Sequence, residues 1–155
     1  MTDEAIRREP GLEALTDTTL AVRRLISASQ DLTIRTARHM RLNVGDMTAI
    51  LLLSEHGPMG VVELARRLGV SSPATTLLVD RLESSGHVER VRDPDDGRRV
   101  RVTDTPAGRA STRQAWLPAI QEIDAVCRSL PESDQVVARD LLDRLTAVMT
   151  RGARS

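Results

Sequence analysis

Two short amphipathic segments and a strong reverse turn follow one another between residues 61 and 104, and this order constrains the fold more than any other part of the chain. In residues 61–68 the apolar side chains have the spacing of one helix face. These side chains are Val61, Leu64, Ala65 and Leu68. Gly69 then interrupts the pattern, so we predict a short helix that ends in a glycine turn.

A second helix is predicted to begin at Ser71 or Ser72, either of which can cap its first turn, and to end near Ser85. Pro73 suits the first turn, because a missing backbone N–H costs nothing there. Gly86 suits the residue after the helix. The face that would pack on residues 61–68 carries Thr75, Leu78, Val79 and Leu82.

A charged β-hairpin is predicted next. Residues 87–92 and 99–103 are short, charged and β-branched, and the turn-forming sequence Asp93-Pro94-Asp95-Asp96-Gly97 lies between them. The hairpin carries five arginines, which are Arg90, Arg92, Arg98, Arg99 and Arg101. Four carboxylates offset them, so an ordinary solvated hairpin is the alternative to a nucleic-acid contact.

Helical patterns flank this region on both sides. A first helix is predicted over residues 12–41, and a second one, capped by Asp46, extends to about Glu55. A further helix begins at Thr105-Pro106 and is expected to break or bend near Pro118, and the last helix opens at Pro131. The fold class is therefore mainly α with a small β-hairpin: a winged helix-turn-helix with long terminal helices.

The flanking helices predict a homodimer. The apolar faces of the long helices could fill the core of a monomer. A winged helix needs only residues 43–105, however, which leaves the long helices to pack on each other and on a partner chain, so a dimer is favoured. We predict a DNA-binding region at 43–104 and a helical dimerisation region formed by 12–42 and 105–150. Residues 1–11 and 151–155 are predicted to be flexible tails.

Composition excludes several other classes of protein. Net charge is zero, 28% of the 155 residues are charged, and no apolar run approaches the length of a membrane span. The single cysteine and the three dispersed histidines predict no metal site and no cofactor. No catalytic constellation occurs at credible spacing, so an enzyme is not expected. The charged N-terminus lacks a signal sequence, and a cytoplasmic location is expected.

The predicted geometry suits double-stranded DNA. A helix fits the major groove, and a hairpin beside it can reach the neighbouring minor groove or the phosphates. The exposed face of the second short helix offers Ser71, Ser72, Thr76 and Arg81. Each has an alternative role: the serines can simply start the helix, Thr76 can face solvent, and Arg81 can pair with Asp80 or Glu83.

The sequence resembles the MarR-type (multiple antibiotic resistance) transcriptional regulators over nearly its whole length. Motifs that follow the order and spacing of that family are Glu63-Leu64-Ala65, Leu68-Gly69-Val70-Ser71, Leu78 to Glu83, Gly86, Arg92 to Arg99, and Thr105-Pro106-Ala107-Gly108. The resemblance implies a triangular, mostly helical dimer whose subunits each present a winged helix. It also implies that the first, fifth and sixth helices form the dimer interface.

The resemblance also assigns roles to single residues. In Asp96-Gly97-Arg98 it implies a wing tip where Asp96 holds Arg98, which enters the minor groove. With it, the expected DNA contacts are Ser71, Ser72, Thr76, Leu77, Arg81, Arg98 and Arg99. Leu77 stands where relatives often carry a polar or basic base-reading residue, and Asp104 replaces a leucine that usually ends the second wing strand.

A ligand-responsive repressor on a pseudo-palindromic operator is the predicted function. The resemblance suggests a small aromatic acid as effector, and the candidate contacts are Arg38, His39 and Trp116, although Trp116 is also a natural core or interface residue. The alternative is a winged-helix module that binds protein instead of an operator. Cys127 is expected to be a buried helix residue without a redox role.

Overall fold

The computed structural model describes Glu4 and residues 14–152, and its contacts divide the chain into two compact units, Met1–Ala115 and Trp116–Ser155. Leu12 and most of the predicted tails lie outside the described residues. The last helix includes Arg151 and Gly152, which the sequence had assigned to the C-terminal tail. The predicted division into DNA-binding and dimerisation regions stays a prediction.

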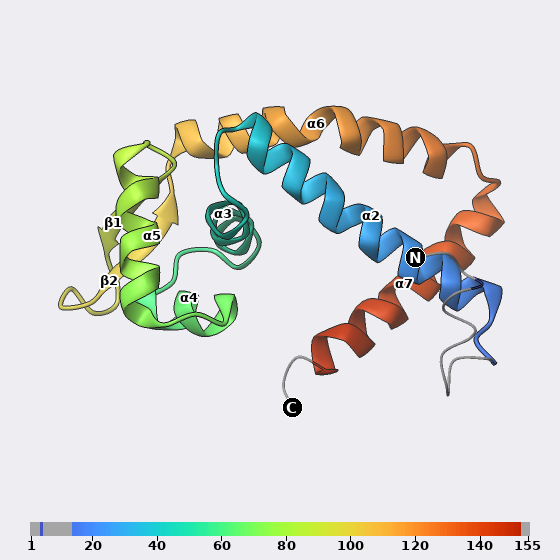
Figure 1. Cartoon of the computed structure of the whole chain (residues 1–155), viewed down its shortest axis with the longest axis horizontal. Helices are drawn as coiled ribbons and strands as arrows, with labels where there is room; N and C mark the ends of the chain where they lie inside the picture. Colours follow the sequence, from blue (N-terminus) through green and yellow to red (C-terminus); the bar gives the residue numbers. More distant parts are fainter. Residues whose placement is uncertain (1–3, 5–13, 153–155) are drawn as a thin grey trace. The chain divides into compact units, whose positions relative to one another are not determined.

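The first unit contains a two-stranded hairpin and several helices (Figure 1). Its elements are α2 (Asp17–His39), α3 (Val44–His56), α4 (Val61–Leu68), α5 (Ser72–Ser84), β1 (Val88–Arg92), β2 (Val100–Asp104) and the beginning of α6 (Pro106–Arg128). The prediction of a mainly helical chain with a small β-hairpin is confirmed. The short helices α4 and α5 pack on each other, as their apolar faces predict.

One hydrophobic core holds the short helices and the hairpin together. Its buried members come from α3, α4, α5, both strands and the segment between α3 and α4, and they are Ala49, Ile50, Leu53, Met59, Leu64, Leu78, Val79, Leu82, Val88 and Val102. On α5 the buried residues are the four that the helical spacing selects. This packing fixes the opposite face of α5 toward solvent.

The ends of the short helices follow local chemistry. Gly69 adopts the left-handed conformation after α4 with φ 68°, and the Ser71 side chain accepts a hydrogen bond from the backbone N–H of Ala74 at the start of α5. The predicted cap at Asp46 is wrong. Asn43 caps α3 instead, because its side-chain oxygen accepts the N–H of Asp46 at 2.8 Å, and Asp46 lies inside the first turn.

The hairpin pairs β1 and β2 in antiparallel register, with Val88 opposite Asp104 and Arg92 opposite Val100. The free edge of β2 is also paired, because Met59 exchanges two backbone hydrogen bonds with Val102, at 3.1 and 2.8 Å. The segment that leads into α4 is thereby bonded to the wing. The hairpin is held at its base by both the core and the backbone.

The second unit consists of the rest of α6 and of α7 (Glu132–Gly152). The helix α6 is continuous through Pro118, so of the expected break or bend, the break does not occur. Among the described residues from 116 onward, no side chain is buried, and many large apolar side chains are exposed, including Ile120, Ile123, Val126, Val137 and Leu142. Within the described ranges, no helix has both the length and the apolar composition of a membrane span.

Candidate nucleic-acid interface

The outer face of α5 presents small and apolar side chains at its N-terminal end. Ser71, Ser72, Thr76 and Leu77 are all exposed, as expected for the predicted contacts. The hydroxyl of Thr76 donates to the backbone carbonyl of Ser72 at 3.0 Å, and Leu77 is 62% exposed. The end of the helix that carries the positive dipole is therefore open and uncrowded, which suits an approach to phosphate or to base edges.

The guanidinium of Arg81 forms an ion pair with Asp46, a carboxylate at the start of α3. Its Nη2 donates to Asp46 Oδ1 at 2.8 Å, and Asp46 is only 5% exposed. Neither Asp80 nor Glu83, the partners considered from the sequence, takes this role. Arg81 thus fastens α5 to α3, and half of its side chain remains in solvent.

Asp80 and Glu83 pair instead with Arg90 on β1. The Arg90 guanidinium donates to Asp80 Oδ1 at 2.6 Å and to Glu83 Oε2, and Glu83 Oε1 accepts the backbone N–H of Arg90. The hydrogen bond to Asp80 is the main cause that raises the pKa of Arg90 above its ordinary value. This cluster joins the second half of α5 to the hairpin and removes Arg90 from the set of free cations.

Two carboxylates shape the turn of the wing. Buried Asp93 accepts the backbone N–H of Asp95 at 3.0 Å and the Arg101 guanidinium at 2.7 Å, and these bonds hold its pKa below the ordinary range. Asp96 accepts the backbone N–H of Arg98 at 3.1 Å, while its other oxygen pairs with Arg99. Asp96 therefore orients the backbone of Arg98 and the side chain of Arg99, and not the Arg98 guanidinium.

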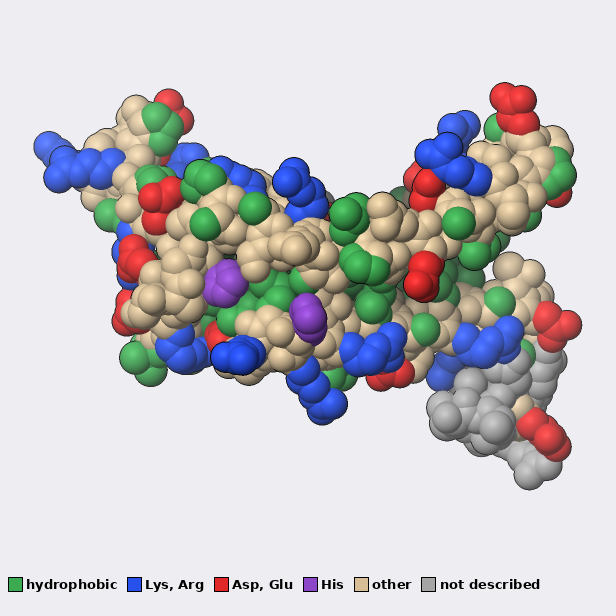
Figure 2. Space-filling view, turned by 90° about the horizontal axis from the view of Figure 1, so that it is seen from above, with side chains coloured by type: hydrophobic (Ala, Val, Ile, Leu, Met, Phe, Trp, Pro, Cys, Tyr) green, Lys and Arg blue, Asp and Glu red, His purple; other side chains and the backbone are tan. Residues whose placement is uncertain are grey.

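Arg92 and Arg98 carry the unpaired positive charge of the hairpin. Both are exposed, and neither guanidinium has a partner among the described residues. Figure 2 shows basic and acidic side chains interspersed at the end of the molecule that carries α5 and the hairpin. The wing therefore offers two individual guanidinium groups and no broad basic surface.

Both arginines of α4 are paired with the carboxylate of Glu63 in the same helix. Glu63 accepts hydrogen bonds from Arg66 at 2.8 Å and from Arg67 at 2.7 Å. These bonds, with that of Arg66 the largest cause, lower the pKa of Glu63 from 4.5 to about 2. The carboxylate is therefore ionised at neutral pH, and the two arginines and one glutamate of α4 leave it a net charge of +1.

The base of the wing is held by polar contacts of Asp104, the last residue of β2. Asp104 at the end of β2 is buried, and its Oδ1 accepts the Arg109 guanidinium at 2.8 Å. Thr105 caps α6 by accepting the N–H of Gly108 at 2.8 Å, and its hydroxyl donates to the carbonyl of Gly86. An ion pair and a helix cap thus hold the base of the wing.

Of the three predicted effector residues, Arg38 and His39 are neighbours in the first unit, whereas Trp116 belongs to the second unit. Arg38 and His39 are exposed at the end of α2, and His39 lines a small hollow of about 240 Å³ with Met40, Ser111, Gln114 and Ala115. Trp116 belongs to the second unit, where it is half-buried and its indole N–H has no partner among the described residues. Within the described part of the chain, no group of acidic, cysteine or histidine side chains is arranged to hold a metal ion.

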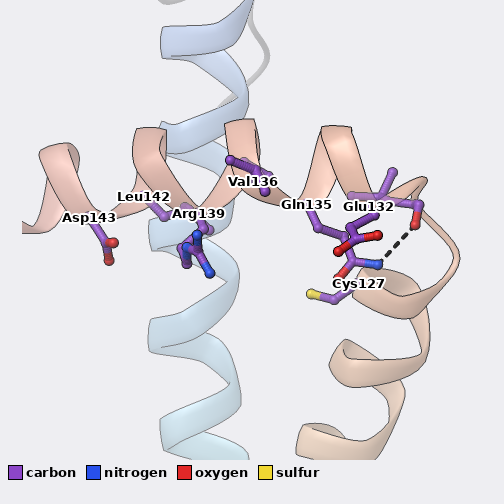
Figure 3. A pocket seen from close by; sticks show the side chains of 9 residues that line it. Cys127, Glu132, Gln135, Val136, Arg139, Leu142 and Asp143 are labelled. Atoms are coloured by element: carbon purple, nitrogen blue, oxygen red, sulfur yellow. Dashed lines mark hydrogen bonds between the residues drawn. The ribbon is translucent and has the colours of Figure 1, made fainter.

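A second hollow, of about 460 Å³, lies in the second unit between the end of α6 and α7 (Figure 3). Leu130, Val136 and Leu142 contribute apolar walls, and Gln135 is held there by a hydrogen bond to the carbonyl of Leu130 at 2.9 Å. The expectation that Cys127 is buried is wrong: it is exposed and lines this hollow. The hollow is part of the uncovered apolar surface of the second unit.

Sequence reasoning missed two residues of the candidate interface. Arg92 was counted among the hairpin arginines but not selected, and only the pairing of its neighbours distinguishes it. Asp46 was interpreted as a cap, because nothing in the sequence links it to Arg81, 35 positions away. Both depend on contacts between distant elements, which local patterns do not encode.

Comparison with known proteins gives consistent similarities. A sequence model described as the MarR family matches residues 37–100, which include α3, α4, α5 and most of the hairpin. An HTH-type transcriptional regulator of Bacillus subtilis, YcgE, itself uncharacterized, is 35% identical over 89 residues. That match covers 57% of this chain and 58% of YcgE, so the chain spans little more than half the length of this relative.

Solved structures extend the similarity to the fold. A MarR family protein from Bacillus stearothermophilus is 26% identical with a TM-score of 0.68, and the match covers 88% of this chain and 99% of that protein. The apo form of MarR from E. coli is 21% identical with a TM-score of 0.61, covering 84% of this chain and 97% of that structure. The second similarity shows a shared fold.

Proposed function

Because this chain belongs to the MarR family, we propose that it is a transcriptional regulator that binds double-stranded DNA as a homodimer. The proposal places α5 in the major groove and Arg98 in the flanking minor groove of a pseudo-palindromic operator. Repression, with release by a small-molecule effector, is the mode of action that we propose.

One observation carries the proposal: an uncrowded helix N-terminus stands beside a hairpin whose exposed Arg92 and Arg98 have no carboxylate partner among the described residues. The other arginines of the hairpin are paired within the protein. An unpaired guanidinium does not have to give up an existing ion pair when it meets phosphate or a narrow minor groove. The two free groups are therefore the best candidates for DNA contacts on the wing.

The dimer is supported by the second unit. In the described residues from 116 onward no side chain is buried, although α6 and α7 carry many large apolar residues. Two isolated helices with such faces are marginal in water, whereas burial against a second copy stabilises them. A twofold dimer also suits two copies of α5 about 34 Å apart, one turn of DNA.

We place the effector at the end of α2, beside His39, Ser111 and Gln114. The hollow there, about 240 Å³, suits a ligand of one ring, and its polar side chains can bond to a carboxylate or phenol. Such a ligand acts as a switch only if it binds the DNA-competent and released states unequally, by about 1–3 kcal/mol.

The test is DNA binding at different salt concentrations. The purified protein, offered a pool of random duplexes, should select a common inverted repeat. Its affinity for that repeat, measured by fluorescence anisotropy, should fall steeply between about 50 and 200 mM salt, because phosphate contacts release counterions. A winged helix that binds protein would select no duplex, and that result would refute the proposal.

The replacement Arg98→Ala should weaken binding to the selected repeat by about 1–3 kcal/mol, roughly 5- to 150-fold, because a minor-groove contact is lost. The dimer and the melting temperature should not change, since Arg98 is exposed and its guanidinium forms no hydrogen bond or ion pair with the described residues. Arg23→Ala, which removes the same charge from the exposed surface of α2, is the matched control. Unchanged affinity of the Arg98 variant would exclude the minor-groove role.

A further inference from the structure

We propose that α5 recognises its DNA chiefly through thymine methyl groups and that Leu77 is the specificity-determining residue. This inference rests on the proposed DNA-binding function and adds the class of base that the helix reads. It follows from the bonding of every other side chain on the outer face of α5. Apart from the two short serine hydroxyls at its start, the polar side chains on this face are bonded within the protein, and the large side chain left free there is apolar.

The hydroxyls at the start of α5 are engaged with the helix itself. The Ser71 side chain accepts the N–H of Ala74, and the hydroxyls of Thr75 and Thr76 donate to the carbonyls of Ser71 and Ser72. The hydroxyl hydrogens of Thr75 and Thr76 are thus already bonded to backbone, and the Ser71 oxygen is occupied as a helix cap. Only the Ser72 hydroxyl in this turn has no partner among the described residues.

The charged residues further along α5 are engaged with other elements. Arg81 is paired with Asp46, and it also donates to the carbonyl of Leu77 at 3.4 Å. Asp80 and Glu83 are both paired with Arg90. The helix contains no asparagine, glutamine or lysine, and its single arginine is the paired one. The side chains that usually make bidentate contacts with guanine or adenine are therefore not available.

Leu77 is the large exposed apolar side chain of this helix, with 62% of its surface in solvent. Pro73 and Ala74, four and three positions earlier, are exposed on the same face. The three residues form an apolar stripe along the part of α5 that would enter the groove. Leu77 also lines a shallow hollow with Asp80, Arg81, Ser84 and Ser85, so its side chain is accessible from the outside.

In the major groove, one kind of chemical group is complementary to an apolar stripe, the methyl group of thymine. Among the base edges, only thymine presents an apolar group, its C5-methyl, while the other edges present hydrogen-bond donors and acceptors. Leucine against a donor such as the cytosine amino group would leave that group without a partner, which disfavours cytosine. The pairing of Leu77 with a thymine methyl thus provides both attraction and discrimination.

The experiment uses the full-length protein and the duplex that it selects from a random pool. The selected half-site should contain thymine at a fixed position on the α5 side. Replacement of each thymine in turn by deoxyuridine removes one methyl group and leaves base pairing intact. At the position under Leu77, affinity should fall about 3- to 10-fold, the effect of one buried methyl group.

Variants of Leu77 connect this effect to the residue. In Leu77→Ala, the thymine and uracil duplexes should bind with the same affinity, whereas Leu77→Met, which keeps an apolar side chain, should retain the difference. Because the side chain is exposed, both variants should melt at the wild-type temperature. The comparison is a double-mutant cycle between one side chain and one methyl group.

The outcomes separate this inference from the function on which it rests. Sequence-specific binding that tolerates uracil at every position would overturn the inference and leave the proposed function intact. Thymine preference that persists in Leu77→Ala would also overturn it, because another residue would then be the reader. Failure to select any duplex would refute the proposed function itself.

Discussion

Replacement of Leu141 or Leu145 by aspartate is expected to convert the protein into a monomer, or to unfold its second unit, and in either case to abolish operator binding. Both leucines lie on the apolar stripe of α7, and Leu141 is 37% exposed in the single chain. If a second copy covers this stripe, each aspartate places an uncompensated charge in the interface, which costs several kcal/mol.

Light scattering and circular dichroism distinguish the possible effects of these variants. By light scattering, the wild-type protein should have twice the mass of one chain. The variants should have the mass of a single chain, or their circular dichroism should show a loss of helix. Thr146→Asp adds the same charge at an exposed polar position of the same helix and should remain dimeric. A folded, dimeric Leu141→Asp or Leu145→Asp protein would show that α7 is not the dimer interface.

Gly108→Ala is expected to destabilise the first unit by about 3 kcal/mol, the upper range for overpacking. A Cβ at this position would lie 2.2 Å from the carbonyl oxygen of His87 and 2.9 Å from its Cα. These are backbone atoms between α5 and β1, so no side-chain rotation can make room. The start of α6 would have to move away from the hairpin, and the cap formed by Thr105 would be lost with it.

Thermal unfolding followed by circular dichroism measures this effect, and the melting temperature should fall by roughly 6–12 °C. Gly97→Ala is the matched control, because nothing lies within 4 Å of a Cβ at Gly97 and its backbone is not left-handed. It should change the melting temperature little. Equal stability of the two variants would contradict the close packing of α6 on His87.

The elements of the winged helix could be predicted because their signals are local. Residues 61–68 form the predicted helix, and Gly69, Ser71 and Gly86 have the roles that their conformational preferences indicate. The turn sequence at 93–97 separates two strands within one residue of the expected bounds. In each case the determining interactions lie within a few positions of one another, so a pattern in the sequence is sufficient.

The sequence predicts which residues belong to the site but not which of their charges are paired, because several of the ion pairs join separate elements. The sequence suggests Asp80 or Glu83 as partners of Arg81, and the structure pairs it with Asp46. Five hairpin arginines are equivalent in the sequence, but three of them are neutralised by distant or turn carboxylates. The pairs of Arg81 and Arg90 depend on which elements pack together, and helical periodicity carries no information about that choice, whereas Arg99 and Arg101 pair within the hairpin itself.

The start of α6 is bonded directly to the segment that links α5 to the wing and to the last residue of the wing. Thr105 bonds to the carbonyls of Gly86 and His87, Gly108 packs on His87, and Arg109 pairs with Asp104. No flexible joint therefore lies between the first turn of α6 and the parts of the protein that would meet DNA. If the proposed effector displaced this first turn of α6, α5 and the wing would therefore be expected to move together with it.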